Sequence, residues 1–194
     1  MKSRIFRAIL LLATIAIALD RTNAADPPTD EKDVLNLLHC DEFSKSQKLV
    51  SWGDKAFFIY VSLLEDKRTE PEDVRRIFWV LTEVKGDRSQ FLKHAVERLA
   101  DEHMKVRKAA LDLLAHIGTR KETAALVAFL PDKEAVIVYY ASQALGAVGG
   151  PPGLVALDAW LLGDDHANDV KLREHVKGYR DELAARLAKE PKKK

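Results

Sequence analysis

The clearest regularity in the sequence is a helical pattern of apolar positions that recurs about every 32 residues. Residues 106–118 (VRKAALDLLAHIG) align without gaps with residues 137–149 (IVYYASQALGAVG), a step of 31 residues, and both segments end in Gly. Steps of 32 residues backward and 33 forward reach weaker copies that begin at Val74 and Val170. Spacing of this kind is typical of amphipathic helices, so we expect four related units.

A second apolar stretch precedes each copy and ends in Leu, any residue and Asp. The four acidic positions are Asp66, Asp101, Asp132 and Asp164. Asp is a favoured capping residue, so we expect it to cap the following helix. Within these stretches the apolar residues again follow helical spacing. The sequence therefore predicts helix pairs at about residues 54–85, 88–117, 120–148 and 151–188.

The repeated unit resembles the HEAT-repeat family in its short bacterial form. The resemblance rests on the pattern D-x-x-x-x-V-R-x-A-A-x-x-x-L-x-x-I-G, present as Asp101, Val106, Arg107, Ala109, Ala110, Leu114, Ile117 and Gly118. The third unit has Val138 where the family has Arg. The first unit has Ile77 and Phe78 in place of the two Ala, and the last keeps its Asp, Val170 and Lys171.

This resemblance implies an all-α fold, a right-handed α-solenoid of stacked antiparallel helix pairs with about four repeats and terminal caps. The Ala pair lets neighbouring helices approach closely, and the Gly that ends each unit is expected in the left-handed conformation. The family also forms an Asp-Arg ladder along the stack. Asp101, Arg107 and Asp132 could form it here, and Val138 would interrupt it.

The ends of the chain differ from the repeats. Residues 1–24 combine a basic start, an apolar run over residues 8–19 and small residues before Ala25, which is typical of a secretory signal peptide. The run of 12 residues is shorter than the roughly 20 needed to span a bilayer as a helix. We therefore expect cleavage after Ala24, a periplasmic or secreted protein, and no stable membrane insertion afterwards.

The remaining chain divides into three parts. Residues 25–53 are expected to form an extended leader and capping helices at 31–38 and 44–52, residues 54–188 the repeat domain, and residues 189–194 a basic tail. A final helix is expected over residues 168–189, where charged side chains replace the contacts that a further unit would make.

Charge and motif content argue against most chemistries. Residues 25–188 carry a net charge of −5, which does not favour nucleic acid as a partner. The sequence lacks the common phosphate-binding, hydrolase and zinc motifs, so we expect no enzyme, no cofactor and no metal. Asp164, Asp165, His166 and Asp169 could bind a cation, but helix capping by Asn168 or Asp169 is the favoured interpretation. Cys40 is expected to be a small buried residue, and the alternatives are a nucleophile or a thiol that forms a disulfide between chains.

Candidate binding residues follow from the alignment of the four repeated helices. One row contains Arg76, Lys108, Tyr139 and Leu172, and the next contains Trp79, Leu111, Ser142 and His175. Six of them, Arg76, Trp79, Lys108, Leu111, Tyr139 and His175, are predicted to contact a partner. Trp79 could instead belong to the core of a degenerate first unit.

These observations favour an exported, non-enzymatic module that binds a protein or peptide partner on the concave face of the solenoid. The alternative is an accessory subunit or structural piece of a larger cell-envelope enzyme assembly. The oligomeric state stays open.

Overall fold

The computed structural model describes residues 30–39 and 43–190. All regular structure in these ranges is helical. The helices are α2 (Glu31–Leu38), α3 (Phe43–Trp52), α4 (Phe57–Glu65), α5 (Pro71–Glu83), α6 (Leu92–Glu97), α7 (Met104–Ile117), α8 (Thr123–Val127), α9 (Ala135–Val148), α10 (Pro151–Leu162) and α11 (Val170–Ala188). The predicted signal peptide, the start of the leader, Cys40 and the last four residues lie outside the described ranges. No helix within those ranges is long and apolar enough to cross a membrane.

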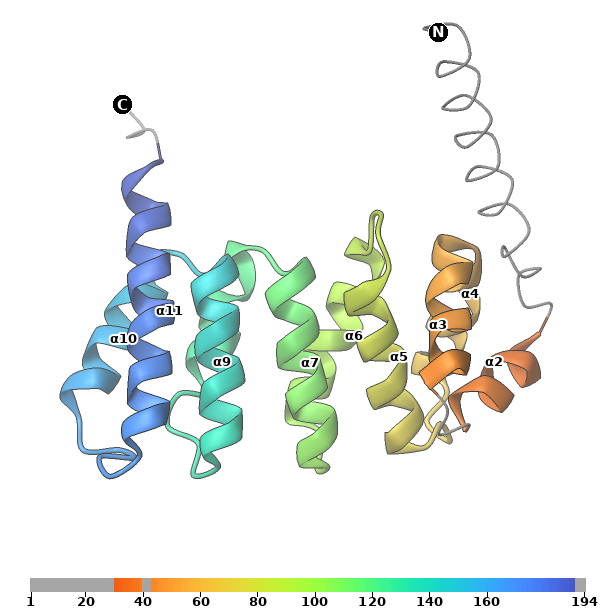
Figure 1. Cartoon of the computed structure of the whole chain (residues 1–194), viewed down its shortest axis with the longest axis horizontal. Coiled ribbons are helices and arrows are strands. Elements are labelled where there is room, and N and C mark those ends of the chain that lie inside the picture. Colours follow the sequence, from red (N-terminus) through yellow and green to blue (C-terminus); the bar gives the residue numbers. More distant parts are fainter. Residues whose placement is uncertain (1–29, 40–42, 191–194) are drawn as a thin grey trace, which may run out of the picture.

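The helices form two layers that run along the molecule (Figure 1). The odd-numbered helices α3, α5, α7, α9 and α11 contact one another in sequence order and form one layer. The even-numbered helices form the other layer, and α6, α8 and α10 each contact the odd-numbered helix that follows them. The predicted helix pairs are therefore confirmed as α4/α5, α6/α7, α8/α9 and α10/α11. The all-α solenoid is confirmed as well.

The core repeats with the sequence. Four positions of α7 and the four positions 31 residues later in α9 have no exposed surface: Val106, Ala110, Leu113 and Leu114, then Ile137, Ala141, Ala144 and Leu145. Fully burying an aliphatic side chain contributes about 1.5–3 kcal/mol to stability. Because these side chains fill the seams between units, no helix pair could bury its apolar face without its neighbours.

Helix α5 is offset from α7 by 33 residues, not by the 32 that the sequence alignment assumed. Ile77 and Phe78 are completely buried, as are Ala110 and Leu111 exactly one such step later along the chain. A difference of one residue rotates a side chain by about 100° around the helix axis. The offset of 33 therefore makes Trp79 the equivalent of Asp112, whereas the sequence alignment had paired it with Leu111.

The Gly at the end of the two central units has a different role from the one predicted, whereas Gly86 of the first unit has a positive φ of 116°. Gly118 and Gly149 have φ of −64° and −60°, so neither is left-handed. A Cβ at Gly118 would lie 2.4 Å from the carbonyl oxygen of Leu114, and one at Gly149 would lie 2.5 Å from that of Leu145. Close approach to the helix end, rather than φ, therefore requires Gly here.

The Asp residues between the paired helices also act differently from the prediction. Their side chains accept a hydrogen bond from the backbone N–H two residues later, at Asp66 (2.9 Å), Asp101 (2.9 Å) and Asp132 (2.8 Å). These bonds close a turn before the helix begins, so they do not cap it. The expected Asp-Arg ladder is replaced by backbone contacts, because Arg107 donates to the carbonyl oxygens of Asp101 and Glu102, both at 3.0 Å.

Candidate functional site

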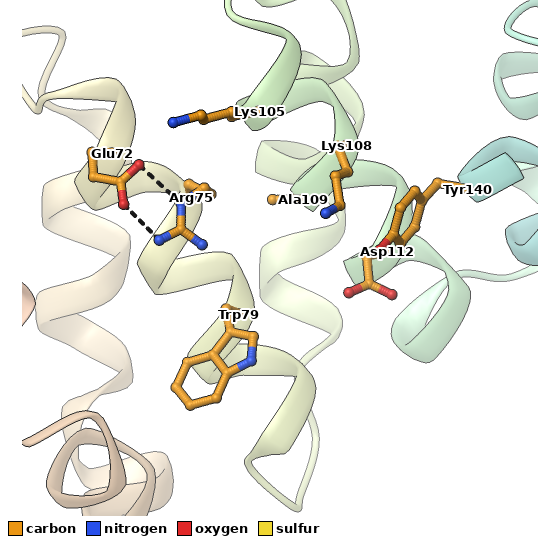
Figure 2. A pocket seen from close by; sticks show the side chains of 8 residues that line it. All are labelled: Glu72, Arg75, Trp79, Lys105, Lys108, Ala109, Asp112 and Tyr140. Atoms are coloured by element: carbon orange, nitrogen blue, oxygen red, sulfur yellow. Dashed lines mark hydrogen bonds and ion pairs between the residues drawn. The ribbon is translucent and has the colours of Figure 1, made fainter. Parts of the chain in front are cut away.

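A groove of about 520 Å³ lies on the odd-numbered layer across three consecutive repeats (Figure 2). It is lined by Glu72, Arg75 and Trp79 from α5, by Lys105, Lys108, Ala109 and Asp112 from α7, and by Tyr140 from α9. We call this surface the α5–α7–α9 groove. Glu72 and Lys105 lie at one end of it, and Trp79 and Asp112 lie at the other (Figure 2).

Helix α7 provides the middle of the groove. Lys105, Lys108, Ala109 and Asp112 are three or four residues apart, so one face of the helix presents all four. The opposite face carries Ala110 and Leu114, which have no exposed surface. The two faces of α7 thus separate a polar, open surface from the apolar seam.

On the α5 side, an ion pair orders the wall of the groove. Arg75 donates from Nε to Glu72 at 2.9 Å and from Nη2 at 2.5 Å, a two-pronged contact that fixes both side chains. Arg76 donates from Nε to the same carboxylate at 3.2 Å. The hydrogen bonds from Arg75 lower the pKa of the Glu72 carboxyl to about 2. Glu72 is therefore ionised at neutral pH, and its carboxylate already accepts hydrogen bonds from Arg75 and Arg76 of the same helix.

On the α9 side, the ammonium group of Lys108 lies 4.9 Å from the centre of the Tyr140 ring. Such cation–π contacts contribute about 0.5–1 kcal/mol at exposed sites. Figure 2 shows Lys108 beside this ring, whereas Lys105 reaches from α7 toward α5. Within the described ranges, neither lysine has a carboxylate at ion-pair distance.

Asp112 is the second acidic side chain of the groove. Burial raises the pKa of its carboxyl above the ordinary value, although the charges of His116 and Lys108 partly offset this effect. Within the part of the chain that the structure describes, its carboxylate accepts no hydrogen bond. A half-buried carboxylate without a donor is costly, so a ligand that brings an N–H group to it would gain binding free energy.

The structure separates the six residues predicted to contact a partner. Trp79 and Lys108 line the groove, and Arg76 lies beside it on Glu72. Leu111 has no exposed surface, so its assignment to the binding surface was wrong. The sequence left open whether Trp79 is a binding residue or a core residue. Its side chain is half-buried and has both roles in the structure, because it packs against the core and also lines the groove.

In the second predicted row, the residues of α7 and α9 face the core and not the groove. Leu111 and Ser142 occupy equivalent core positions of α7 and α9, and both are completely buried. Ser142 satisfies its hydroxyl by donating to the carbonyl oxygen of Val138 at 2.7 Å. Leu172, from the first row, is buried too. Sequence reasoning missed six groove residues, five on α5 and α7 and one on α9: Glu72, Arg75, Lys105, Ala109, Asp112 and Tyr140.

Tyr139, which is half-buried, and His175, which is exposed, belong to a second part of the same layer, where aromatic rings contact one another. The rings of His175 and Tyr179 from α11 meet the Tyr139 ring edge to face, with centres 5.1 and 5.6 Å away. The hydroxyl of Tyr179 also donates to that of Tyr139 at 2.8 Å. The predicted residue Tyr139 therefore joins α9 to α11, and its hydroxyl is already bonded.

The acidic turn between α10 and α11 is organised by its own hydrogen bonds. Asp169 caps α11 by accepting from the backbone N–H of Leu172 at 2.9 Å. His166 Nε2 donates to the carbonyl oxygen of Asp132 at 2.9 Å, and its ring stacks on Trp160. Throughout the described ranges, His, Cys, Asp and Glu side chains form no group of three or more that could hold a metal ion.

Comparison with known proteins agrees with this architecture. Residues 92–175 match a protein family described as HEAT repeats, a range that runs from α6 into α11. No curated protein matches the chain. HEAT repeats generally mediate protein–protein interactions and are typically non-enzymatic scaffolds. The match and the stacked helix pairs support a HEAT-repeat family for this chain.

Proposed function

We propose that this protein is a non-enzymatic binding module that holds an extended segment of a protein partner in the α5–α7–α9 groove. One observation carries the proposal. Charged and aromatic side chains from three successive repeats line one open surface, where Trp79, Lys108 and Tyr140 are only partly covered by their own chain. Aromatic and long basic side chains lose little on exposure and gain much when a partner covers them.

The geometry suits an extended ligand. Neighbouring helices of a solenoid are about 8–10 Å apart, so a segment that crosses α5, α7 and α9 needs about five or six extended residues. Such a segment would touch a different repeat every three residues or so. Affinity would then come from several modest contacts, which is typical of solenoid surfaces.

Peptide display tests this proposal without a known partner. Residues 25–194 would be used to select from a random nine-residue peptide library, and the selected peptides would be titrated by calorimetry. The groove variant combines Lys108→Ala with Asp112→Ala, which leaves the net charge unchanged. We expect it to weaken binding of the selected peptides at least tenfold.

A matched control variant is available on α11. Lys177 and Asp181 form an exposed ion pair of 2.9 Å outside the groove, so replacing both by Ala removes the same two charges. This control should bind the selected peptides as the parent does. Equal binding by the groove variant and the control would show that the partner surface lies elsewhere.

We also propose that the module acts after export. The basic start, the 12-residue apolar run and the small residues before Ala25 support cleavage after Ala24. N-terminal sequencing of the protein recovered from the periplasmic or secreted fraction should begin at Ala25. Recovery of the intact chain from membranes would contradict this proposal and would indicate that the segment is an anchor.

A further inference from the structure

We infer that the segment held in the α5–α7–α9 groove is acidic, with one carboxylate side chain between Lys105, Lys108 and Arg75 and an adjacent apolar or aromatic side chain against Trp79 and Ala109. This inference rests on the proposed function, because it names the chemistry of the partner for the same surface. Four features of the groove support it.

The first feature is the charge of the lining. Arg75, Lys105 and Lys108 face two carboxylates, and one of these, Glu72, is held by Arg75 in a two-pronged ion pair. Lys105 is exposed and has no hydrogen bond or ion pair within the described ranges. Lys108 has only the face of Tyr140 and the more distant charge of Asp112. An incoming carboxylate would supply the partner that both lysines lack.

The second feature is the contrast with the rest of the chain. Residues 25–188 carry a net charge of −5, yet the groove lining carries an excess of one positive charge. On α11, at the end of the same layer, Glu174, Asp181 and Glu182 are exposed. The groove is therefore a local basic surface on an acidic protein. This disfavours the Lys-rich segment 189–194 of the same chain as its occupant, because like charges would repel.

The third feature is Asp112 at the other end of the groove. Its carboxylate is partly buried, has a raised pKa because of that burial, and accepts no hydrogen bond in the part of the chain described. It lies one helical turn beyond Lys108, so a bound segment that meets the lysines with a carboxylate presents backbone N–H groups to Asp112. A peptide offers both charge-complementary groups, whereas a simple anion offers only one.

The fourth feature is the modest size of the charge excess. Nucleic-acid and polyphosphate sites need several uncompensated cations along a stripe, because each phosphate brings a full negative charge. Here the excess is a single positive charge, and Asp112 would repel a row of phosphates. One or two carboxylates next to Trp79 match the groove better. The aromatic ring and the small Ala109 leave room for an apolar side chain beside the bound carboxylate.

Synthetic peptides test the inference directly. The probe is a fluorescein-labelled heptapeptide with blocked termini in which glutamate alternates with phenylalanine. Two controls replace every glutamate with glutamine or with lysine. By fluorescence anisotropy we expect the acidic peptide to bind residues 25–194 at least tenfold more tightly than either control. The binding should also weaken as NaCl rises from about 50 to about 500 mM, since added salt screens exposed charges.

Protein variants then locate the binding. Charge reversal at Lys105→Glu and Lys108→Glu should weaken the acidic peptide at least tenfold and should favour the lysine peptide. The matched control reverses Lys93 and Lys121, two exposed lysines outside the groove, and should leave the preference for the acidic peptide intact. Thermal unfolding of all variants checks that the substituted proteins are folded.

The outcomes separate the two proposals. If the acidic peptide binds no better than its controls while display still selects groove-dependent neutral or basic peptides, the acidic inference is wrong and the proposed function stands. If the acidic peptide binds equally well to the Lys105/Lys108 variant and to the control variant, the inference is wrong as well. If no peptide depends on the groove, both proposals fail. Self-association of the free protein that the Lys105/Lys108 reversal abolishes would identify a second copy as the occupant and would overturn the inference.

Discussion

Two parts of the odd-numbered layer of helices differ in the side chains that lie on their surface. Between α5, α7 and α9 the surface is open and carries charged side chains, whereas between α9 and α11 it is closed by aromatic rings. Lys108 and Tyr139 occupy equivalent positions one repeat apart. Lys108 lines the groove, and Tyr139 is covered by His175 and Tyr179 of the final helix. Both side chains are half-buried, so an equivalent position in a repeat does not determine what a side chain contacts, because the next helix in the stack supplies different neighbours.

A glycine explains the close approach at the closed junction. A Cβ at Gly146 would lie 3.1 Å from both the Cβ and the carbonyl oxygen of Tyr179. The equivalent position in α7 is Ala115, which is only partly buried. Helix α11 can therefore pack directly on the backbone of α9. The small residue and the Tyr139–Tyr179 hydrogen bond belong to the same contact between α9 and α11.

The largest effect on the free energy of unfolding is expected from a substitution at one of two neighbouring alanines on α7, which differ in burial. Ala110 is completely buried in the seam, whereas Ala109 lines the open groove. Ala110→Asp would bury an unpaired carboxylate and should lower the free energy of unfolding by about 4 kcal/mol, or prevent folding. Ala109→Asp should change it by less than about 1 kcal/mol. Urea unfolding followed by circular dichroism measures both, and similar losses would show that the groove floor is not open.

The next effect separates the closed junction from an exposed helix surface. Gly146→Ala adds a methyl group against Tyr179, whereas a Cβ at Gly178 of α11 would have no atom within 4 Å. Both changes gain helix propensity, which stabilises by about 0.5–1 kcal/mol. We expect Gly178→Ala to raise the melting temperature and Gly146→Ala to lower it, since overpacking costs about 1–3 kcal/mol. A rise for both would mean that α9 and α11 can move apart without cost.

A smaller change tests the hydrogen bond at the closed junction. Tyr179→Phe removes the hydroxyl that donates to Tyr139 at 2.8 Å and keeps the ring in place. The free energy of unfolding should fall by about 1 kcal/mol. The affinity of groove-selected peptides should stay the same, because the groove is lined by other residues. A loss of peptide affinity without a loss of stability would contradict the proposal, because it would place the binding surface at the junction of α9 and α11.

The smallest effect is expected on the free energy of unfolding at low pH, through Glu72 on the α5 side of the groove. The pKa of Glu72 is lowered from 4.5 to about 2 by the hydrogen bonds from Arg75. A lowered folded-state pKa means that the ionised form stabilises the protein above pH 4.5, and that this contribution is lost as the pH falls toward 2. Glu72 is partly exposed, so the loss should stay below about 1 kcal/mol. Unfolding of Glu72→Gln between pH 6 and pH 2 should show a correspondingly weaker pH dependence than the parent.

The sequence predicted the fold well because the two central units share one clear pattern. Residues 106–118 and 137–149 align without gaps, and the same four positions are buried in both. Helix pairs and their order follow from that alignment and from the apolar spacing in the weaker copies. The structure corrected only local details, such as the backbone conformation of Gly118, because a close approach between a Cβ and a carbonyl oxygen is visible only in three dimensions.

The candidate site was predicted only in part because of a shift of one residue. The first unit lacks the Ala pair that fixes the register, so Val74 was aligned with Val106 and Trp79 was placed in the same row as Leu111. The apolar run Ile77, Phe78, Leu81 would have matched the second unit at a step of 33 and would have corrected the error. The cation–π contact of Lys108 and the closure over Tyr139 depend on neighbouring helices. The sequence of a single unit contains no information on either.

Amide chemical shifts provide the most direct test of the difference between the two junctions. A peptide selected by display would be titrated into isotope-labelled residues 25–194, and shifts would be followed in two-dimensional spectra. We expect the changes to concentrate at Arg75, Lys108 and Tyr140 of the groove, with little change at His175 and Tyr179. Changes concentrated at α11, with the groove signals unmoved, would contradict the claim that the open junction is the binding surface.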